Sequence, residues 1–189
     1  MVHVLLSTIH GSHLYGTHRP DSDHDTYQVV LSGRTRQRQR GVDDAMTITL
    51  EDFSRQVAIG VPQALEALWS PVAQVDPTWG PWFAGLRPGL PAAIDRHRRT
   101  ALSFGLYDGG RHGRGLERAR TSEKIKLRRH ALRLAHNLYH LASHGWYDPV
   151  LAPEQVRQLD ELARLEDHAY ERILRERVAQ ALDARWPCG

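Results

Sequence analysis

The sequence predicts an α+β fold, with a small mixed β-sheet flanked by helices and followed by a helical C-terminal half. Three observations support this. Short apolar runs rich in β-branched residues are confined to the first quarter of the chain. Beyond residue 91 the apolar residues recur at helical spacing instead. No repeat or obvious long linker separates the two parts. We therefore expect an α/β unit over residues 1–90 and a helical region packed against it over residues 91–189.

The strands are expected near the N-terminus, where alternating or β-branched apolar residues form three short runs. These runs cover residues 2–9, 24–31 and 45–50. The tract from Gly33 to Gly41 has alternating arginines between two glycines. It indicates a hairpin loop or the tip of an edge strand.

The helices are expected after the third strand. Glu51 and Asp52 favour the start of a helix that runs to about Ile59. Pro62 suits the first turn of a second helix that ends near residue 70. The Pro-, Gly- and Trp-rich segment 71–91 is expected to be a connector with one short helix. Four longer helices are predicted over residues 91–106, 117–144, 153–165 and 166–185.

Composition limits the classes of function. The chain has 189 residues, a net charge of +3 and a pI near 9.3, which permits a nucleic-acid partner without requiring one. The single cysteine, Cys188, excludes an intramolecular disulfide and fits a reducing, cytoplasmic location. The N-terminal apolar run is too short for a signal peptide, and no run approaches the length of a membrane span, about 18 residues.

The stretch from Gly11 to Asp25 carries the strongest functional indication. Gly11-Ser12 follows a predicted strand, so its backbone N–H groups can approach a triphosphate without an intervening side chain. Asp23 and Asp25, two residues apart, point to the same face of a strand and can hold Mg²⁺. Such Asp-Ser-Asp runs also cap turns, but the nearby Gly-Ser pair favours a metal site.

A phosphoryl-transfer site with two metal ions usually needs a third carboxylate from a neighbouring strand. Asp43 and Asp44, directly before the third predicted strand, are the nearest candidates. Glu51 and Glu66 are poorer ones. Asp21 has the same parity as Asp23 and Asp25, but it follows a proline and is expected in the turn.

These motifs resemble the signature of the DNA polymerase beta-like nucleotidyltransferase superfamily. The closer resemblance is to its branch of predicted nucleotidyltransferases, the RNA repair pathway DNA polymerase beta family. The specific matches are Gly-Ser-x-x-Tyr-Gly over residues 11–16 and Pro-Asp-Ser-Asp-x-Asp over residues 20–25. Softer matches cover residues 44–53, 62–71 and 126–134. The chain departs from the family in its arginine-rich tract and in having Val61 where the family often has Asn.

The resemblance implies an enzyme of the EC 2.7.7 type that moves a nucleoside monophosphate from an NTP to a hydroxyl and releases pyrophosphate. It implies that Asp23 and Asp25 bind catalytic Mg²⁺ or Mn²⁺, with Asp44 as the third carboxylate. Gly11 and Ser12 would hold the triphosphate of the NTP, for example ATP. The softer motif on the long predicted helix assigns further triphosphate contacts to Lys126 and Arg133.

The acceptor is less well indicated than the metal site. Residues 111–133 carry many more Lys and Arg than Glu, and on the predicted helix the basic residues lie opposite an apolar stripe. This basic face is either a solvated surface or a surface that contacts phosphates. Together with the arginine tract it favours an RNA acceptor, such as a tRNA or a damaged RNA end. A protein hydroxyl, giving AMPylation, and a small molecule stay open.

Other classes of function also stay open. The protein could bind nucleotides or RNA without catalysis. The spacing from Arg129 to His136 and from Arg133 to His140 resembles the Arg-x6-His motif of HEPN-type ribonucleases. His136, His140 and His144 could hold a metal, although no cysteine or His-Glu-x-x-His pattern accompanies them. Four histidines, of which one could move a proton or orient a phosphate, surround the acidic cluster: His10, His13, His18 and His24.

Overall fold

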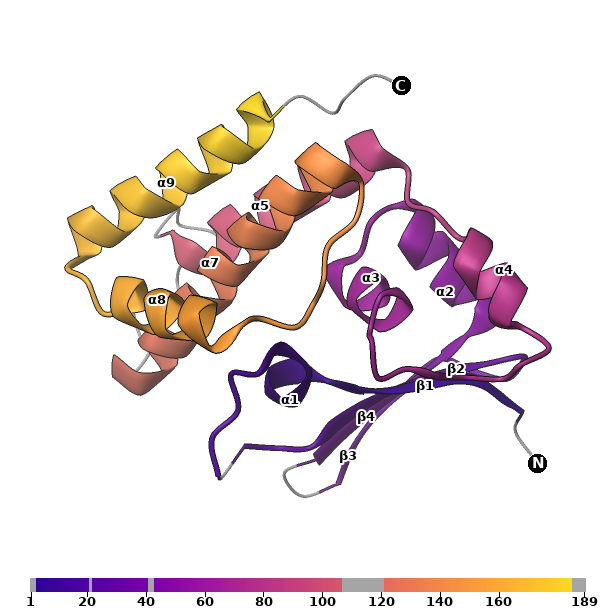
Figure 1. Ribbon diagram of the computed structural model, residues 1–189. Helices are drawn as coiled ribbons and strands as arrows, with labels where there is room; N and C mark the ends of the chain where they lie inside the picture. Colours follow the sequence, from indigo (N-terminus) through magenta and orange to yellow (C-terminus); the bar gives the residue numbers. More distant parts are fainter. Residues whose placement is uncertain (1–2, 21, 41–42, 107–120, 185–189) are drawn as a thin grey trace. The chain divides into compact units, whose positions relative to one another are not determined.

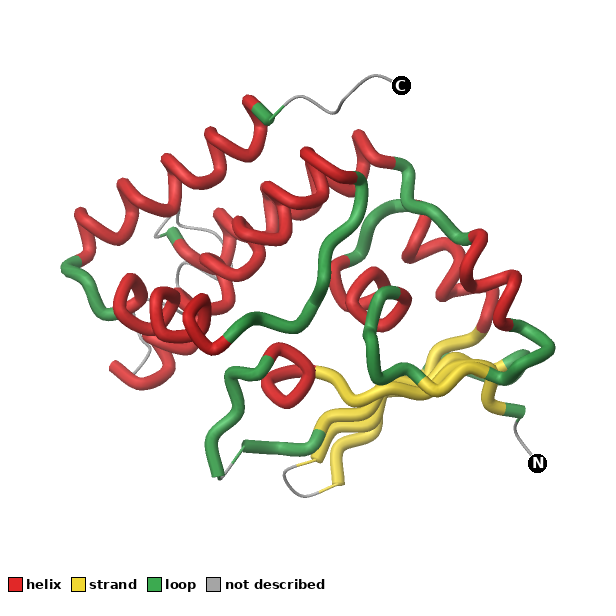
Figure 2. Tube along the Cα trace, in the orientation of Figure 1, coloured by secondary structure: helices red, strands yellow, loops and turns green. Residues whose placement is uncertain are grey.

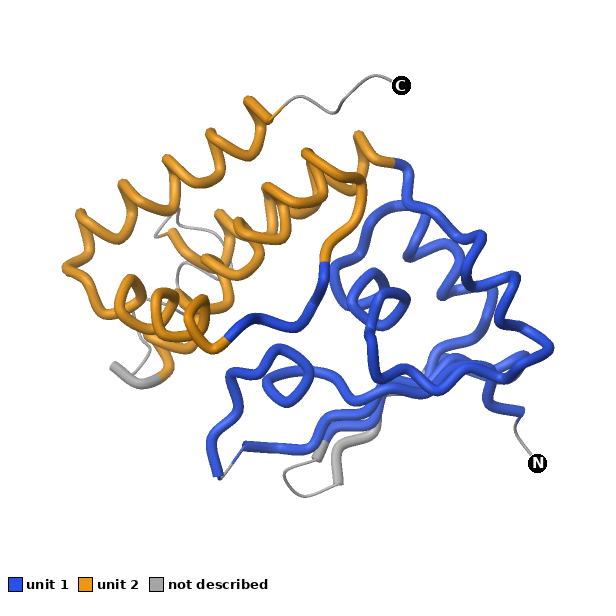
Figure 3. The backbone as a smooth tube through the Cα atoms, in the orientation of Figure 1, with its two compact units in different colours: residues 1–89, 148–152 blue, residues 90–147, 153–189 orange. Residues whose placement is uncertain are grey.

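The computed structural model describes residues 3–20, 22–40, 43–106 and 121–184. The chain divides into two compact units, shown in Figure 3. The first comprises residues 1–89 and 148–152, and the second comprises residues 90–147 and 153–189. No local pattern in the sequence indicates that residues 148–152 belong to the first unit. Their backbone bonds to it directly, because the Leu151 N–H donates to the Tyr15 carbonyl at 3.3 Å.

The first unit is built on a five-stranded mixed sheet with the order β3-β4-β2-β1-β5. Strands β2 and β4 are parallel, and the other neighbours are antiparallel. Figure 1 shows α1, α2 and α3 on one face of this sheet. In chain order its elements are β1 (Val4–His10), α1 (Gly11–Tyr15), β2 (Asp25–Val30), β3 (Arg36–Arg40), β4 (Asp43–Thr49), α2 (Leu50–Ala58), α3 (Pro62–Leu68), β5 (Gln74–Val75) and α4 (Gly80–Gly85).

Most of these elements were predicted. The three expected strands are confirmed as β1, β2 and β4, and the arginine tract contains the edge strand β3. The start of α2 is fixed by Thr49, whose hydroxyl accepts a hydrogen bond from the Asp52 N–H at 3.2 Å. Strand β5 was not predicted. It has only two residues, and it forms because Val75 pairs with Leu6 of β1.

The core of the first unit lies between the sheet and its helices. Side chains alternate along a strand, so Tyr27 and Val29 of β2 point to the helix-covered face. Tyr27 packs edge-on against Phe53 of α2, with ring centroids 6.2 Å apart. Phe53 in turn meets Phe83 of α4 at 5.8 Å. These aromatic contacts tie α2 and α4 to the sheet.

The second unit has no strand among its described residues, and Figure 2 shows its helices joined by loops. Its helices are α5 (Leu90–Gly105), α7 (Thr121–His144), α8 (Pro153–Ala163) and α9 (Asp167–Asp183). Helix α7 packs against the other three through the predicted apolar stripe, in which Leu134, Leu138 and Leu141 are buried. The predicted fold class, a mixed sheet with flanking helices and a helical C-terminal half, is confirmed. Residues 111–120 of the basic segment lie outside the described residues.

None of the helices in the described part of the chain has the length and apolarity needed to cross a membrane.

Gly105 at the end of α5 lies where three helices meet, so we expect Gly105→Ala to destabilise the protein. A Cβ there would lie 2.7 Å from the Tyr170 hydroxyl and 2.9 Å from the Ala131 Cβ. Overpacking of this kind costs about 1–3 kcal/mol. Urea unfolding measures the cost. Gly85→Ala is the matched control, because among the described residues nothing beyond its chain neighbours and its own helix backbone lies within 4 Å of its Cβ position. Equal stability of the two variants would contradict the expectation.

Candidate active site

The predicted acidic residues lie at one end of the sheet in the first unit. His10 of β1 pairs with Asp25 of β2. In the parallel β2–β4 pair Thr26 pairs with Ala45, so Asp44 is the next neighbour of Asp25. Because side chains alternate along a strand, His10, Asp25 and Asp44 point to the face on which Tyr27 is buried. The third carboxylate expected from the sequence therefore lies beside Asp25.

The carboxylate of Asp25 is crowded by other acids. Partial burial raises the pKa of Asp25, and the negative charges of Asp44 and Asp23 raise it further. The backbone N–H of Asp44, which donates to this carboxylate, and the nearby His10 oppose the increase without cancelling it. A group whose ionised form is disfavoured in this way is typical of sites that bind a cation.

Gly11 lies directly against Asp25 and is the first residue of α1. Its φ of +65° is in the left-handed region, and a Cβ added to it would overlap the Asp25 Oδ2 atom. Only glycine suits both conditions. Ser12 follows as a half-buried residue whose carbonyl accepts from the N–H of Thr17 at 2.9 Å and closes the turn.

Asp23 is exposed and precedes β2. The loop before it is fixed by a tight turn, in which the Ser22 N–H donates to the Arg19 carbonyl at 3.0 Å. The loop also holds a stack of imidazole rings. His13 of α1 stacks on His24 with centroids 4.0 Å apart and on His18 with centroids 4.5 Å apart. Asp21 lies outside the described residues.

A second acid is fully buried on the same side of the sheet. Glu66 of α3 is 0% exposed. Its Oε2 atom accepts a 2.6 Å hydrogen bond from the Tyr15 hydroxyl and lies 3.2 Å from His10 Nε2. Nearby, the hydroxyl of Tyr27 is buried and has no hydrogen-bond partner among the described residues. Burial, followed by the charge of Glu66, raises the pKa of Tyr27.

Sequence reasoning ranked Glu66 only as a poor candidate for the third carboxylate and gave Tyr15 no role. One signal could have identified this cluster. Glu66 interrupts an apolar helix, Ala-Leu-Glu-Ala-Leu, and a carboxylate within such a run is buried only where donors meet it.

The residues at the sheet end fit a divalent cation by their chemistry. Carboxylate oxygens are the ligands that Mg²⁺ and Mn²⁺ take, and a cation would relieve the repulsion around Asp25. Within residues 3–20, 22–40, 43–106 and 121–184, no three His, Cys, Asp or Glu side chains form a ready-made metal-binding group.

Lys126 and Arg133, the predicted triphosphate contacts, both lie on α7 of the second unit. Lys126 is exposed. Arg133 is 2% exposed, and one of its Nη atoms lies 3.1 Å from His130 Nδ1. Their neighbour Arg129 is paired with Asp160 of α8 at 2.8 Å, so the first arginine of the Arg-x6-His pattern is engaged within the helical unit.

The histidines of α7 form a row of rings. His136 and His140 have centroids 4.6 Å apart, and His140 stacks on His144 at 5.5 Å. Burial lowers the pKa of His136 to about 4, and the charges of His140, Arg177 and Arg133 add to the effect. His136 is therefore neutral at pH 7.

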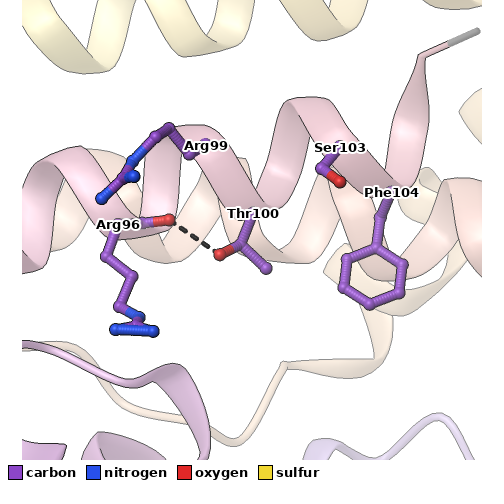
Figure 4. Close-up of a pocket in the computed structure, with 5 residues that line it drawn as sticks. All are labelled: Arg96, Arg99, Thr100, Ser103 and Phe104. Atoms are coloured by element: carbon purple, nitrogen blue, oxygen red, sulfur yellow. Dashed lines mark hydrogen bonds between the residues drawn. The ribbon is translucent and has the colours of Figure 1, made fainter. Parts of the chain in front are cut away.

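A shallow hollow on α5 of the second unit is shown in Figure 4. It is lined by Arg96, Arg99, Thr100, Ser103 and Phe104. The Thr100 hydroxyl donates to the Arg96 carbonyl at 2.8 Å, and Arg99 pairs with Asp95 at 2.9 Å. Since all five residues belong to one helix and these two polar groups are engaged within it, this hollow is a weaker candidate than the sheet end.

Comparison with known proteins adds a distant structural similarity. No protein-family model matches the chain, and no curated protein matches it. Among solved structures, the crystal structure of a nucleotidyltransferase-like protein from Exiguobacterium sibiricum is similar over 97% of this chain and 67% of that one. The identity is 14% and the TM-score is 0.31. A similarity of this size carries no argument about activity, so the proposal below depends on the residues of this chain.

The raised pKa of Asp25 has a consequence for stability. A carboxyl whose folded-state pKa is raised contributes stability that is present below pH 3.8 and is lost as pH rises through the folded-state pKa. We therefore expect Asp25→Asn to raise the melting temperature at pH 7 by about 2 °C and to change it little at pH 3. Scanning calorimetry in EDTA measures this difference.

Asp95→Asn is the control for that measurement. The hydrogen bond from Arg98 is the largest cause that lowers the pKa of Asp95, so this variant should not gain stability at pH 7. A lower melting temperature for Asp25→Asn would show that its carboxylate is not under repulsion.

His136 gives the opposite dependence on pH. Its pKa is lowered from 6.5 to about 4, so the neutral ring contributes stability above pH 6.5 that is lost as pH falls towards 4. The loss is at most about 1.4 kcal/mol per pH unit. We expect His136→Gln to flatten the decline of unfolding free energy between these two pH values, measured by urea titration. The same change at exposed His168 should leave the slope unaltered, and a slope that is equal in all three proteins would contradict the expectation.

Proposed function

We propose that the protein is a metal-dependent nucleotidyltransferase that transfers a nucleoside monophosphate from an NTP to a hydroxyl acceptor and releases pyrophosphate. The observation that carries the proposal is the alignment of Asp25 and Asp44 on one face of adjacent strands, with Asp25 against the bare backbone of Gly11. Acids that repel one another beside a glycine turn form a site suited to a cation and a polyphosphate.

The reaction proceeds by in-line displacement. The acceptor oxygen forms a bond to the α-phosphorus, the bond from that phosphorus to the bridging oxygen of the leaving group breaks, and pyrophosphate departs with the electron pair. The proton of the acceptor hydroxyl passes to solvent or to a nearby base. When bound, Mg²⁺ or Mn²⁺ would supply charge stabilisation at the phosphates and would lower the pKa of the acceptor hydroxyl.

The protein's own residues bind and orient. Asp25 and Asp44 would hold the cation, with Asp23 contributing from the exposed loop before β2. The backbone at Gly11 and Ser12 would approach the triphosphate, because Gly11 has no side chain to obstruct it. Lys126, which is exposed on α7, offers a charge for a phosphate.

RNA is the acceptor that we propose. Strand β3 carries Arg36, Arg38 and Arg40 and pairs directly with β4, the strand that contributes Asp44. An arginine-rich strand and a net charge of +3 suit a polyanionic acceptor better than a neutral small molecule.

The proposal predicts labelled-nucleotide transfer that depends on the acids. Purified protein with Mg²⁺ and each labelled NTP should label total RNA, whereas Asp25→Asn and Asp23→Ala should lower the rate at least about 100-fold by removing ligands of the cation. Gel electrophoresis of RNA and protein fractions measures the product.

Asp95→Asn, an exposed acid in the helical unit, is the matched control and should keep the full rate. If protein is labelled instead of RNA, the proposed RNA acceptor is wrong, but the proposed transfer of a nucleoside monophosphate still holds. If neither fraction is labelled and Asp25→Asn leaves the affinity for Mg²⁺·NTP unchanged, the proposed enzymatic activity is wrong. The protein would then be a nucleotide-binding protein without catalytic activity.

A further inference from the structure

The buried acid Glu66 has no part in the function proposed above, although it lies on the same face of the sheet as Asp25. Its neighbours in α3, Ala64, Leu65 and Ala67, are all fully buried and apolar. A carboxylate removed from water in this way costs several kcal/mol unless donors compensate it. The Tyr15 hydroxyl donates to its Oε2 atom at 2.6 Å, and His10 Nε2 lies 3.2 Å from the same atom.

Those two partners come from either end of the Gly-Ser turn. His10 is the last residue of β1, and Tyr15 is the last residue of α1. Gly11 and Ser12 lie between them. Tyr15 is hydrogen-bonded to this oxygen atom, whereas His10 Nε2 lies 3.2 Å from it without a hydrogen bond among the described residues. Glu66 therefore contacts both ends of this short segment and restrains its backbone against the sheet. The segment is held further by the rings of His10 and Tyr15, which meet edge-on at 5.9 Å.

The same cluster reaches Asp25 from two directions. Through the turn it fixes Gly11, whose missing Cβ leaves the room that the Asp25 Oδ2 atom occupies. Through the sheet it fixes His10, which pairs with Asp25 across the β1–β2 ladder. A shift of the turn or of the His10 ring would therefore displace the carboxylate or expose it to a different neighbour.

We propose that Glu66 is a positioning residue of this site, which acts through Tyr15 and His10 to hold Gly11 and the Asp25 carboxylate in the arrangement that binds a divalent cation. The proposal rests on the proposed function for the cation. It adds an acid that touches neither metal nor nucleotide and yet sets the affinity for the metal. Outer partners that orient metal ligands have effects of this kind.

The test measures binding of Mn²⁺ alone, without nucleotide, by the electron paramagnetic resonance signal of the free ion. Glu66→Gln keeps the volume and one acceptor oxygen but removes the charge and one acceptor. We expect it to bind Mn²⁺ about tenfold more weakly than the wild type. Tyr15→Phe, which removes one of the two contacts, should give a smaller loss in the same direction. Asp25→Asn sets the level expected when the ligand itself is removed.

Glu51→Gln is the matched control, because the Glu51 side chain on α2 is 85% exposed and pairs with Arg55 at 2.9 Å. It should bind Mn²⁺ as the wild type does. A second readout needs no metal. The ring nitrogen signals of His10 in ¹⁵N NMR spectra should change in Glu66→Gln and stay unchanged in Glu51→Gln, because only the former alters the partner of His10 Nε2.

The outcomes separate this proposal from the proposed function. Wild-type protein that binds no Mn²⁺ would overturn the metal site, and with it both proposals. Wild-type affinity in a folded Glu66→Gln protein, with unaltered His10 signals, would overturn only the positioning role. If Glu66→Gln does not fold, Tyr15→Phe decides, since it retains the Glu66 charge. Wild-type affinity in Tyr15→Phe with unaltered His10 signals would then overturn the positioning role.

Discussion

The close approach of the Asp25 carboxylate to the backbone of Gly11 is the constraint on which the rest of the candidate site depends. It requires a residue without a side chain in the left-handed conformation directly after β1. It also requires the β1–β2 register that places His10 opposite Asp25. A slip of one residue would turn Asp25 to the other face of the sheet. The parallel pairing of β2 with β4 then places Asp44 beside Asp25. The register of β2 against its two neighbouring strands therefore determines the arrangement of the candidate site.

Asp25 and Glu66 of the first unit are both acids in surroundings that disfavour a negative charge, but their local contacts differ. The pKa of Asp25 stays raised, because partial burial, with the charges of Asp44 and Asp23 added, outweighs the Asp44 N–H and His10. Glu66 is fully buried but is met by the Tyr15 hydroxyl and by His10. A carboxylate with a raised pKa at the end of a sheet lowers the stability of the fold at neutral pH. Destabilising groups of this kind are concentrated at sites that bind ligands. A buried and compensated charge, in contrast, fixes the geometry around it.

The helical unit uses much of its positive charge internally. Arg128 of α7 donates to the Leu165 carbonyl at 2.8 Å and to the Asp167 carboxylate, and it lies over the Tyr170 ring at 4.4 Å. Arg129 pairs with Asp160 at 2.8 Å. The sequence suggested a continuous basic face on this helix, because helical periodicity shows which side is polar but not which neighbour meets it. Part of that face is an interface between helices, whereas Lys126 is exposed.

The sequence by itself determined the strands β1, β2 and β4, the order of the long helices and the acidic cluster, because apolar periodicity, turn residues and local spacing are properties of neighbouring residues. Spacing left both Asp43 and Asp44 as candidates for the third carboxylate, and the family resemblance favoured Asp44. Only the tertiary structure decided that β5 exists, that residues 148–152 belong to the first unit, and that Glu66 meets Tyr15 and His10. Each of these depends on contacts between residues far apart in the chain, and a local pattern carries no information about which distant partner will supply a missing strand or donor.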